Sequence, residues 1–421
     1  MTNSKNLNQD KKKKTFTFDS RIDYALILPV FMLLVIGFYA LYVAITHDFQ
    51  AEATRLLTTQ ASWIVIGIFA AIIVMHLNSK ILWNLTPAIY VIGLLLMVLP
   101  IFFYSEATYL STGAKNWVAI GGTNLFQPSE FMKIAYILFL AHLTVTFNEK
   151  LKTPSVKQDF RLILRLILAT VPVALFSLVQ HDFGTFLVFV VIFIGVVLVS
   201  GVSWKIIIPA LAVLGGLIAT VVLMVNNPTG QTILTHVGFG QYQVNRFVAW
   251  LHPFEYAQGI SLQQAQSLTA IGTGGLTGKG INVADLQIPV RESDMIFTII
   301  AENFGFIGAA FTILLYFFLI FRMIRVTMKS NNNFYIFIST GIIMMLLFHV
   351  FENIGAAIGV VPLTGVPLPF ISQGGSALMS DLIAVGLVLA MQYNQLPDFE
   401  ILRTKNRSNL TKRRAKLVKN K

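Results

Sequence analysis

Apolar runs of about 20 residues recur along almost the whole chain, and they limit its fold more than any other feature. A run of this length crosses about 30 Å of hydrocarbon as an α-helix. Backbone groups in lipid must bond to one another, and barrel strands would alternate in polarity over about ten residues, so these runs predict helices. Only 12% of the 421 residues are charged, about half the usual share in a soluble domain. The sequence therefore predicts an all-α polytopic membrane protein.

We expect ten transmembrane helices, at residues 24–45, 61–77, 81–103, 128–147, 162–178, 185–199, 206–225, 293–321, 335–354 and 376–391. The longest connection, residues 226–292, joins the seventh and eighth helices and is expected to form a large extracellular loop. A loop of this size is usually functional. Residues 1–22 and 395–421 are expected to be disordered basic tails on a transmembrane domain of residues 23–394.

The distribution of Lys and Arg predicts the orientation, because cytoplasmic loops carry an excess of both. If the N-terminus is cytoplasmic, 25 of the 31 basic residues lie on the inner side, and ten helices place the C-terminus there as well. The net charge of +12 then indicates attraction to anionic headgroups rather than to nucleic acid. The chain has no cysteine, which excludes disulfides, thiolate metal sites and cysteine nucleophiles.

Asp294 lies where the polar end of the long loop meets the apolar run of the eighth helix. An ionised group at the edge of the hydrocarbon layer is usually functional. The alternative is that Asp294 caps the helix, where free amides favour an anion. Glu302 follows eight residues later, which brings it to within about 80° of Asp294 on a helix surface. Both acids can then face one cavity.

Three more charged residues are expected near the same external face. Glu130 and Lys133 begin the fourth helix and are three residues apart, so they share one helix face. They form either a structural ion pair or a site for a charged substrate group or cation. Asp182 occupies the short external turn between the fifth and sixth helices and can be an ordinary turn residue.

Lys115 precedes the fourth helix in a segment expected at the membrane interface, with Trp117 at headgroup level. Lys279 lies in the glycine-rich stretch 271–281 of the long loop. Such a stretch can hold phosphate through backbone amides, but no strand precedes it, so it is neither a Walker nor a Rossmann motif. The alternative is a flexible lid without ligand contacts.

The last external connection, residues 355–376, contains three prolines and no charged residue. Irregular backbone at membrane depth is tolerated where it lines a cavity, so this connection is expected to form a wall of the site, with Ser372 and Gln373 as candidate substrate-binding residues. His142, His236 and His349 show no metal-ligand spacing and are interpreted as incidental.

The chain resembles the SEDS family (shape, elongation, division and sporulation), the polytopic glycosyltransferases that include RodA and FtsW. The resemblance covers essentially the whole membrane region. Gly278-Lys279-Gly280 favours the RodA-like, elongation branch. The motifs that carry the resemblance are GAKNW (113–117), FQPSEFMK (126–133), QHDFGT (180–185), YQVNRFVAWLHPF (242–254), QAQSLTAIGTGGLTGKG (264–280), ESDMIFTIIAENFGFIG (292–308) and GVPLPFISQGGS (365–376).

This resemblance implies a peptidoglycan glycosyltransferase that polymerises lipid II, an undecaprenyl-pyrophosphate-linked disaccharide pentapeptide, on the outer face of the bacterial cytoplasmic membrane. A class B penicillin-binding protein is the implied transpeptidase partner. The family's essential acid falls on Asp294, which is expected to act as general base on the acceptor sugar hydroxyl with inversion at the anomeric carbon. Glu130, Lys133 and Asp182 match other positions of the family's cavity.

A departing pyrophosphate needs positive charge. Candidates to supply it are Lys115, Lys133, Arg246, Lys279 and Arg291. A divalent cation, Mg²⁺ or Mn²⁺, is a further expectation, while no organic cofactor is expected.

The chain departs from the family pattern at two places, because Glu292-Ser293 replaces the usual His-Thr and Gln373 replaces a common tyrosine. Neither departure removes a charged group. Three other functions remain open: a lipid II flippase, the division-specific FtsW-type polymerase, and a non-catalytic scaffold for a penicillin-binding protein. The first is disfavoured by charges that gather at one external face, since a flippase needs a polar path across the bilayer.

Overall fold

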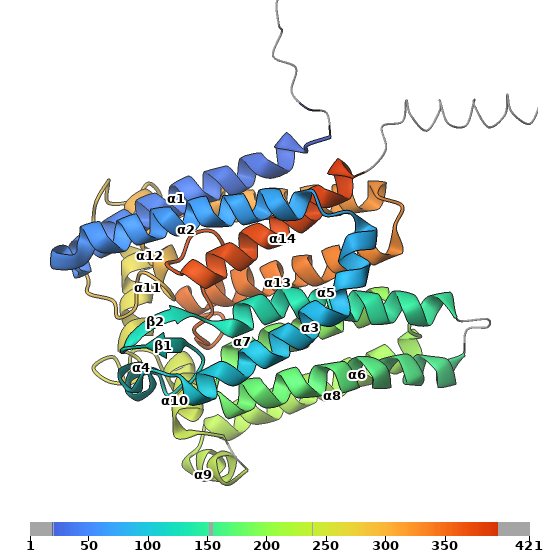
Figure 1. Cartoon of the computed structure of the whole chain (residues 1–421). Helices are drawn as coiled ribbons and strands as arrows, with labels where there is room; N and C mark the ends of the chain where they lie inside the picture. Colours follow the sequence, from blue (N-terminus) through green and yellow to red (C-terminus); the bar gives the residue numbers. More distant parts are fainter. Residues whose placement is uncertain (1–18, 20, 151–154, 238, 395–421) are drawn as a thin grey trace, which may run out of the picture.

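In the computed structural model, long α-helices run side by side and the shorter elements gather at one end of the bundle (Figure 1). The structure describes residues 19, 21–150, 155–237 and 239–394. The two predicted basic tails fall almost entirely on residues 1–18, 20 and 395–421, which lie outside the described residues.

Ten helices correspond to the ten predicted spans: α1 (Tyr24–Asp48), α2 (Ala53–Met75), α3 (Ser79–Phe102), α5 (Pro128–Glu149), α6 (Val156–Val179), α7 (Phe183–Val199), α8 (Trp204–Val225), α12 (Ile296–Lys329), α13 (Asn333–Ala357) and α14 (Gly375–Tyr393). Within the described ranges, nine of them have the length and hydropathy of a membrane span, and α7 is a shorter apolar helix of 17 residues. The prediction of an all-α polytopic membrane protein is confirmed.

The short elements lie at the end of the bundle opposite to the start of α1 and the end of α14 (Figure 1). They are η1 (Gln50–Glu52), α4 (Glu106–Thr112), β1 (Val118–Ile120), β2 (Thr123–Phe126), α9 (Pro228–His236), α10 (Gln241–Leu251) and α11 (Leu262–Gly274). The two strands form an antiparallel hairpin. Three of these helices, α9 to α11, occupy much of the long connection at residues 226–292.

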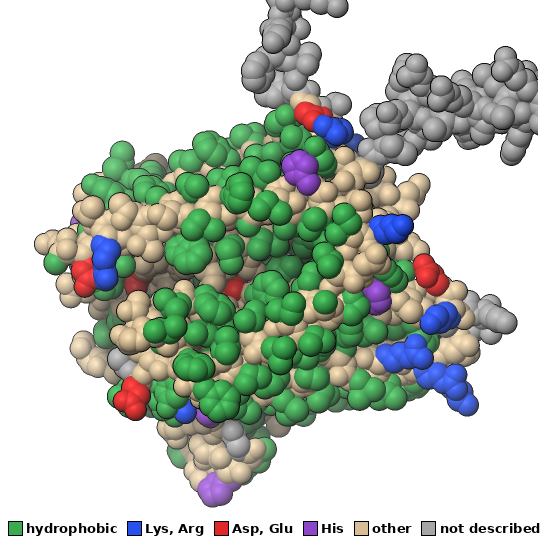
Figure 2. All heavy atoms as spheres, viewed as in Figure 1, with side chains coloured by type: hydrophobic (Ala, Val, Ile, Leu, Met, Phe, Trp, Pro, Cys, Tyr) green, Lys and Arg blue, Asp and Glu red, His purple; other side chains and the backbone are tan. Residues whose placement is uncertain are grey.

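The centre of the bundle is formed by α5, α13 and α14, whose apolar faces are the most deeply buried of the candidate spans. The helices α2, α3, α7 and α12 pack around these three. A broad belt of apolar side chains covers the middle of the face shown in Figure 2, and basic side chains gather at the end where α1 begins. This is the surface expected of a bundle surrounded by lipid. By contrast, α8 packs mainly against α9 and α10.

Several helices begin where the sequence provides an oxygen to cap them. The Asp23 carboxylate accepts from Leu26 N at 3.0 Å, and the Asn78 side chain accepts from Ile81 N at 2.9 Å. Pro128 opens α5 at its first turn, where a missing N–H costs nothing. These local signals explain why α1, α3 and α5 begin within two residues of the prediction, whereas α2 and α6 begin several residues earlier than predicted.

The long helix α12 is interrupted at Gly305, whose φ is 61°. The glycine-rich stretch passes so close that a Cβ on Gly305 would lie 2.4 Å from Gly278 N. Lys279 N donates to Glu302 O at 2.9 Å and Phe306 N donates to Gly275 O at 2.9 Å. Because backbone amides of this stretch are bonded to protein carbonyls, its glycines serve close packing against α12 rather than a phosphate cradle.

Candidate active site

Asp294 lies in the turn that precedes α12, and its carboxylate does not cap that helix. The residue before the first helical position is Met295, and no side chain bonds the first amides of α12. Ser293 Oγ donates to Asp294 Oδ1 at 2.9 Å, and Asn353 Nδ2 donates to Asp294 O at 2.9 Å. The backbone of Asp294 is thereby fixed from α13, while Oδ2 stays free of the helix end. The capping alternative is not realised.

Arg246 of α10 lies beside this carboxylate. A Cβ on Gly365 would be 3.4 Å from Asp294 Oδ2 and 3.6 Å from both terminal nitrogens of the Arg246 guanidinium. With φ at 85° and this crowding, the position suits glycine alone. Arg246 also donates from Nη1 to Leu363 O at 2.6 Å and from Nη2 to the hydroxyl of Tyr242. An acid and a fixed guanidinium therefore lie close together beside the connection between α13 and α14.

The pKa of Asp294 is raised by burial, and the positive charge of Arg246 and the hydrogen bond from Ser293 oppose this rise. Burial also raises the pKa of Glu292, with the nearby negative charge of Asp294 adding to the effect. A carboxylate with a raised pKa accepts a proton more readily at neutral pH, which suits a general base.

The irregular connection between α13 and α14 packs directly on the Asp294 turn, as expected for a wall of the site. Ser372 Oγ donates to Ser293 O at 2.6 Å, and Gln373 N donates to Glu292 O at 2.9 Å. The hydroxyl of Ser372 is therefore engaged with the backbone, whereas the Gln373 side chain is partly exposed.

Glu130 and Lys133 form the ion pair that their spacing allows, and it is buried. Lys133 Nζ lies 2.8 Å from Glu130 Oε2, with side chains 3% and 4% exposed respectively. Lys133 Nζ also contacts His349 Nε2 at 3.2 Å, so His349 is not incidental. Because the pair is shielded from solvent, this geometry favours a structural ion pair over direct substrate contact.

Asp182 is an anchor for three neighbouring segments. Its carboxylate accepts from Asn116 Nδ2 at 2.7 Å, from Gln127 Nε2 at 3.0 Å, and from the Thr185 backbone at 3.1 Å and hydroxyl at 2.8 Å. It caps α7 and ties the hairpin region and the start of α5 to it. With four donors already bound, Asp182 organises this end of the bundle rather than offering a free carboxylate.

Lys115 contacts two aromatic rings and stays partly exposed. Its Nζ lies 4.4 Å from the Tyr104 ring centroid and 4.7 Å from that of Tyr109. Cation–π contacts of this kind leave the ammonium able to meet an anion from its open side. Lys115 thus remains available at the protein surface.

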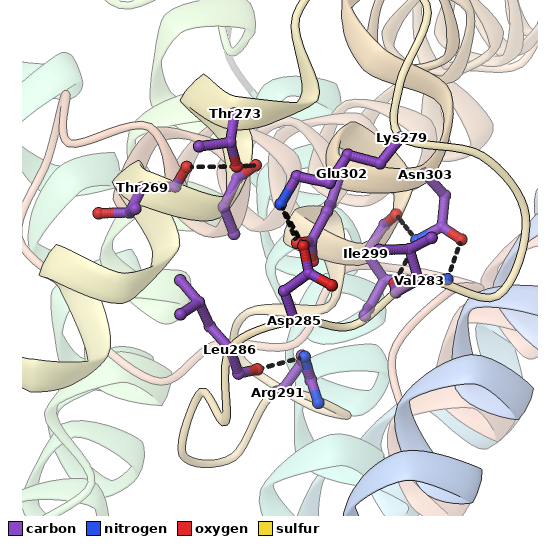
Figure 3. Close-up of polar contacts among 11 residues, drawn as sticks. Thr269, Thr273, Lys279, Val283, Asp285, Leu286, Arg291, Ile299, Glu302 and Asn303 are labelled. Atoms are coloured by element: carbon purple, nitrogen blue, oxygen red, sulfur yellow. Dashed lines mark hydrogen bonds and ion pairs between the residues drawn. The ribbon is translucent and has the colours of Figure 1, made fainter.

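Glu302 does not open into a cavity with Asp294, because it is fully buried and paired with Lys279. Lys279 Nζ reaches Glu302 Oε1 at 2.7 Å and Asp285 Oδ2 at 2.8 Å (Figure 3). The angular separation of Asp294 and Glu302 on a helix surface was the only basis for expecting a shared cavity. The glycine-rich stretch instead brings a cation to Glu302, so Lys279 and Glu302 lock that stretch onto α12.

Arg291 is also engaged within the protein. It is 1% exposed and donates to Asp48 Oδ1 at 2.6 Å and Oδ2 at 3.0 Å. It also donates to Leu286 O at 2.7 Å (Figure 3). It ties the end of α1 to the segment before Asp294. Its guanidinium is therefore a structural clamp in this structure and not an open anion site.

Two acids at the site were not singled out from the sequence. Glu352 on α13 and Asp381 on α14 are 3% and 5% exposed. Glu352 lies within electrostatic reach of Asp294 and Arg246, and Asp381 within reach of Lys133 and Glu130. The signal that could have found them is an acid inside an apolar span.

Across the described ranges, no three Asp, Glu or His side chains gather closely enough to hold a metal ion. An Mg²⁺ ion that binds substrate phosphates usually takes only one or two carboxylates from the protein. The residues present thus do not form a complete protein cage for a divalent cation.

A bundle of long apolar helices with a carboxylate and a guanidinium close together at one end defines a polytopic membrane protein with an active-site-like cluster. The family model described as "Cell cycle protein" (FTSW_RODA_SPOVE) matches residues 24–396. The chain belongs to this family, which is the SEDS family named above.

Curated relatives span nearly the same length. The chain is 32% identical over 333 residues to the probable peptidoglycan glycosyltransferase FtsW of Thiomicrospira cyclica, covering 78% of this chain and 79% of the relative. It is 31% identical to the stage V sporulation protein E of Bacillus subtilis, covering 87% and 96%. It is 28% identical to the peptidoglycan glycosyltransferase MrdB of Escherichia coli K12, covering 91% and 97%.

Solved structures share the fold. A chain from a peptidoglycan synthase complex that coordinates polymerization and crosslinking superposes with a TM-score of 0.70 at 27% identity, covering 89% of this chain and 99% of the other. The rod shape determining protein RodA of Thermus thermophilus gives a TM-score of 0.62 at 26% identity, covering 89% and 98%. The chain is accordingly a multi-pass membrane glycosyltransferase.

Proposed function

We propose that this glycosyltransferase is a peptidoglycan polymerase that joins lipid II units into glycan strands on the outer face of the bacterial cytoplasmic membrane during cell elongation. The family and the names of its relatives support peptidoglycan polymerisation. The site adds the chemistry, since an acid and a guanidinium meet at one end of the bundle. We place both termini in the cytoplasm. In keeping with this, α1 begins and α14 ends at the end of the bundle opposite to the short elements and the site (Figure 1).

The observation that carries the proposal is the Asp294 carboxylate, which is free of the helix cap and faces Arg246. Asp294 removes the proton from the acceptor sugar hydroxyl as the oxygen attacks the anomeric carbon. Such general base assistance typically contributes about 10² to 10⁴-fold. A single displacement inverts the anomeric carbon and releases undecaprenyl pyrophosphate.

The leaving pyrophosphate develops negative charge that fixed donors stabilise. Arg246 is the best placed of the candidate cations because it adjoins Asp294 and is partly exposed, and Lys115 is the second. Lys133, Lys279 and Arg291 are paired with acids and support the site from within. A divalent cation, Mg²⁺ or Mn²⁺, would take most of its ligands from the diphosphate, and no step above depends on it.

We further propose a class B penicillin-binding protein as transpeptidase partner. The structural likeness to a chain of a complex that couples polymerization to crosslinking supports this partner. The elongation role is proposed over the division role on the glycine-lysine-glycine pattern around Lys279. A fluorescent fusion found along the lateral wall supports elongation, and one confined to the septum contradicts it.

The test is polymerisation of labelled lipid II by purified protein with its cognate penicillin-binding protein, for wild type and Asp294→Asn. Wild type is expected to give glycan ladders that vanish in the variant while its thermal stability is retained. Equal ladders from both proteins would show that Asp294 is not the base. Absence of ladders from wild type, with lipid II translocation in liposomes, would support the flippase instead.

A further inference from the structure

Glu352 is a buried acid near the external end of α13, 3% exposed. Its Oε1 accepts two hydrogen bonds from one residue, from Thr364 N at 2.6 Å and from the Thr364 hydroxyl. Its Oε2 is buried without a hydrogen-bond partner in the described structure. A half-satisfied acid inside a membrane span is costly to bury, which points to a role beyond packing.

Through its hydrogen bonds with Thr364, Glu352 holds the segment that adjoins Asp294. Thr364 stands between Leu363 and Gly365. The Leu363 carbonyl accepts from Arg246 Nη1 at 2.6 Å, and a Cβ on Gly365 would lie within 3.6 Å of Asp294 Oδ2 and the Arg246 guanidinium. The segment 363–365 is thus held by Glu352 from α13 and by Arg246 from α10.

Charges reach Asp294 from three elements. Arg246 of α10 is a cation, and Glu352 of α13 and Glu292 of the same turn are acids whose ionised forms repel the Asp294 carboxylate. Arg291 beside Glu292 is already paired with Asp48. Removing the charge of Glu352 therefore leaves Arg246 to act on Asp294 with less opposition, which weakens Asp294 as a base.

We propose that Glu352 is a positioning residue for glycosyl transfer, which holds segment 363–365 and Arg246 in place beside Asp294 and supplies a negative charge that keeps Asp294 ready to accept a proton. The inference rests on the proposed role of Asp294 as the base. It concerns a residue that acts through Thr364, Arg246 and Asp294 rather than through contact with substrate.

Two variants separate the charge from the hydrogen bonds. Glu352→Gln keeps an oxygen for Thr364 and removes the charge, so the acid limb of kcat/KM is expected to move to lower pH by about one unit. Thr364→Val keeps the charge and removes the hydroxyl donor, so kcat is expected to fall about tenfold or more while the acid limb stays in place. The matched control is Glu52→Gln, an exposed external acid paired with Arg55, which should leave both quantities unchanged.

The measurement is lipid II polymerisation across pH by the full chain with its penicillin-binding protein, with Asp294→Asn in the same series. An acid limb that stays at the wild-type pH in Glu352→Gln, or a wild-type kcat in Thr364→Val, would overturn the inference while inactive Asp294→Asn keeps the proposed function. An active Asp294→Asn would instead overturn the proposed base, and the inference with it.

Discussion

Replacing Glu130 by Gln should strongly destabilise the protein, because it leaves Lys133 charged and buried. The pair is 2.8 Å apart, and its side chains are only 3% and 4% exposed. Breaking a buried ion pair from one side typically costs about 3–5 kcal/mol, whereas replacing both partners by neutral groups costs far less. Glu130→Gln and Lys133→Met should each lower the unfolding midpoint by several degrees, and the double variant should recover most of that loss.

The assay is thermal unfolding in detergent together with lipid II polymerisation, on the two single variants and the double variant. Arg55→Met is the control, because it breaks the exposed ion pair with Glu52 and such pairs contribute little. If the buried pair is structural, the double variant regains activity together with stability.

Two results would refute this reasoning. Single variants with wild-type unfolding midpoints would show that burial does not make the pair costly to break. A double variant that regains its stability but makes no glycan would show that Glu130 and Lys133 bind a charged substrate group or a cation, which is the other interpretation of their spacing.

Three further perturbations test the site. Lys279→Met leaves Glu302 buried and unpaired, so it should lower the unfolding midpoint. The double variant Lys279→Met/Glu302→Gln should recover part of that loss. Equal midpoints for Lys279→Met and wild type would contradict this. Asp182→Ala removes an acceptor for four hydrogen bonds and should cost stability that Asp182→Asn partly retains, as thermal unfolding will show. Burial raises the pKa of Asp294, so kcat/KM should fall as pH drops through a value above the ordinary aspartate range, and an acid limb at or below that range in a pH–rate profile would contradict the assignment.

The local parts of the site followed from the sequence because they depend on neighbours along the chain. The three-residue spacing of Glu130 and Lys133 predicts a shared helix face, and an ion pair is found there. The prolines of the last connection predict irregular backbone, and no helix forms between Ala357 and Gly375. Asp294 was singled out by its position where a polar loop meets an apolar run.

The sequence could not give the partners of isolated charges. Arg291 pairs with Asp48, 243 residues away, and Lys279 reaches Glu302 only because the glycine-rich stretch folds against the break in α12 at Gly305. From spacing alone, these cations were equally good candidates for pyrophosphate. Only their ion pairs with acids separate them from Arg246.

By itself, the sequence determined the class of fold, since apolar runs long enough to span lipid must close their backbone hydrogen bonds within each helix. It also determined which residues near Asp294 in the chain carry charge. Tertiary structure decided which of those charges remain open, because pairing depends on helices that meet only after the bundle packs. The same packing brings Glu352 of α13 to Thr364 and places Gly365 against Asp294 and Arg246, a proximity that no period or spacing along the chain encodes.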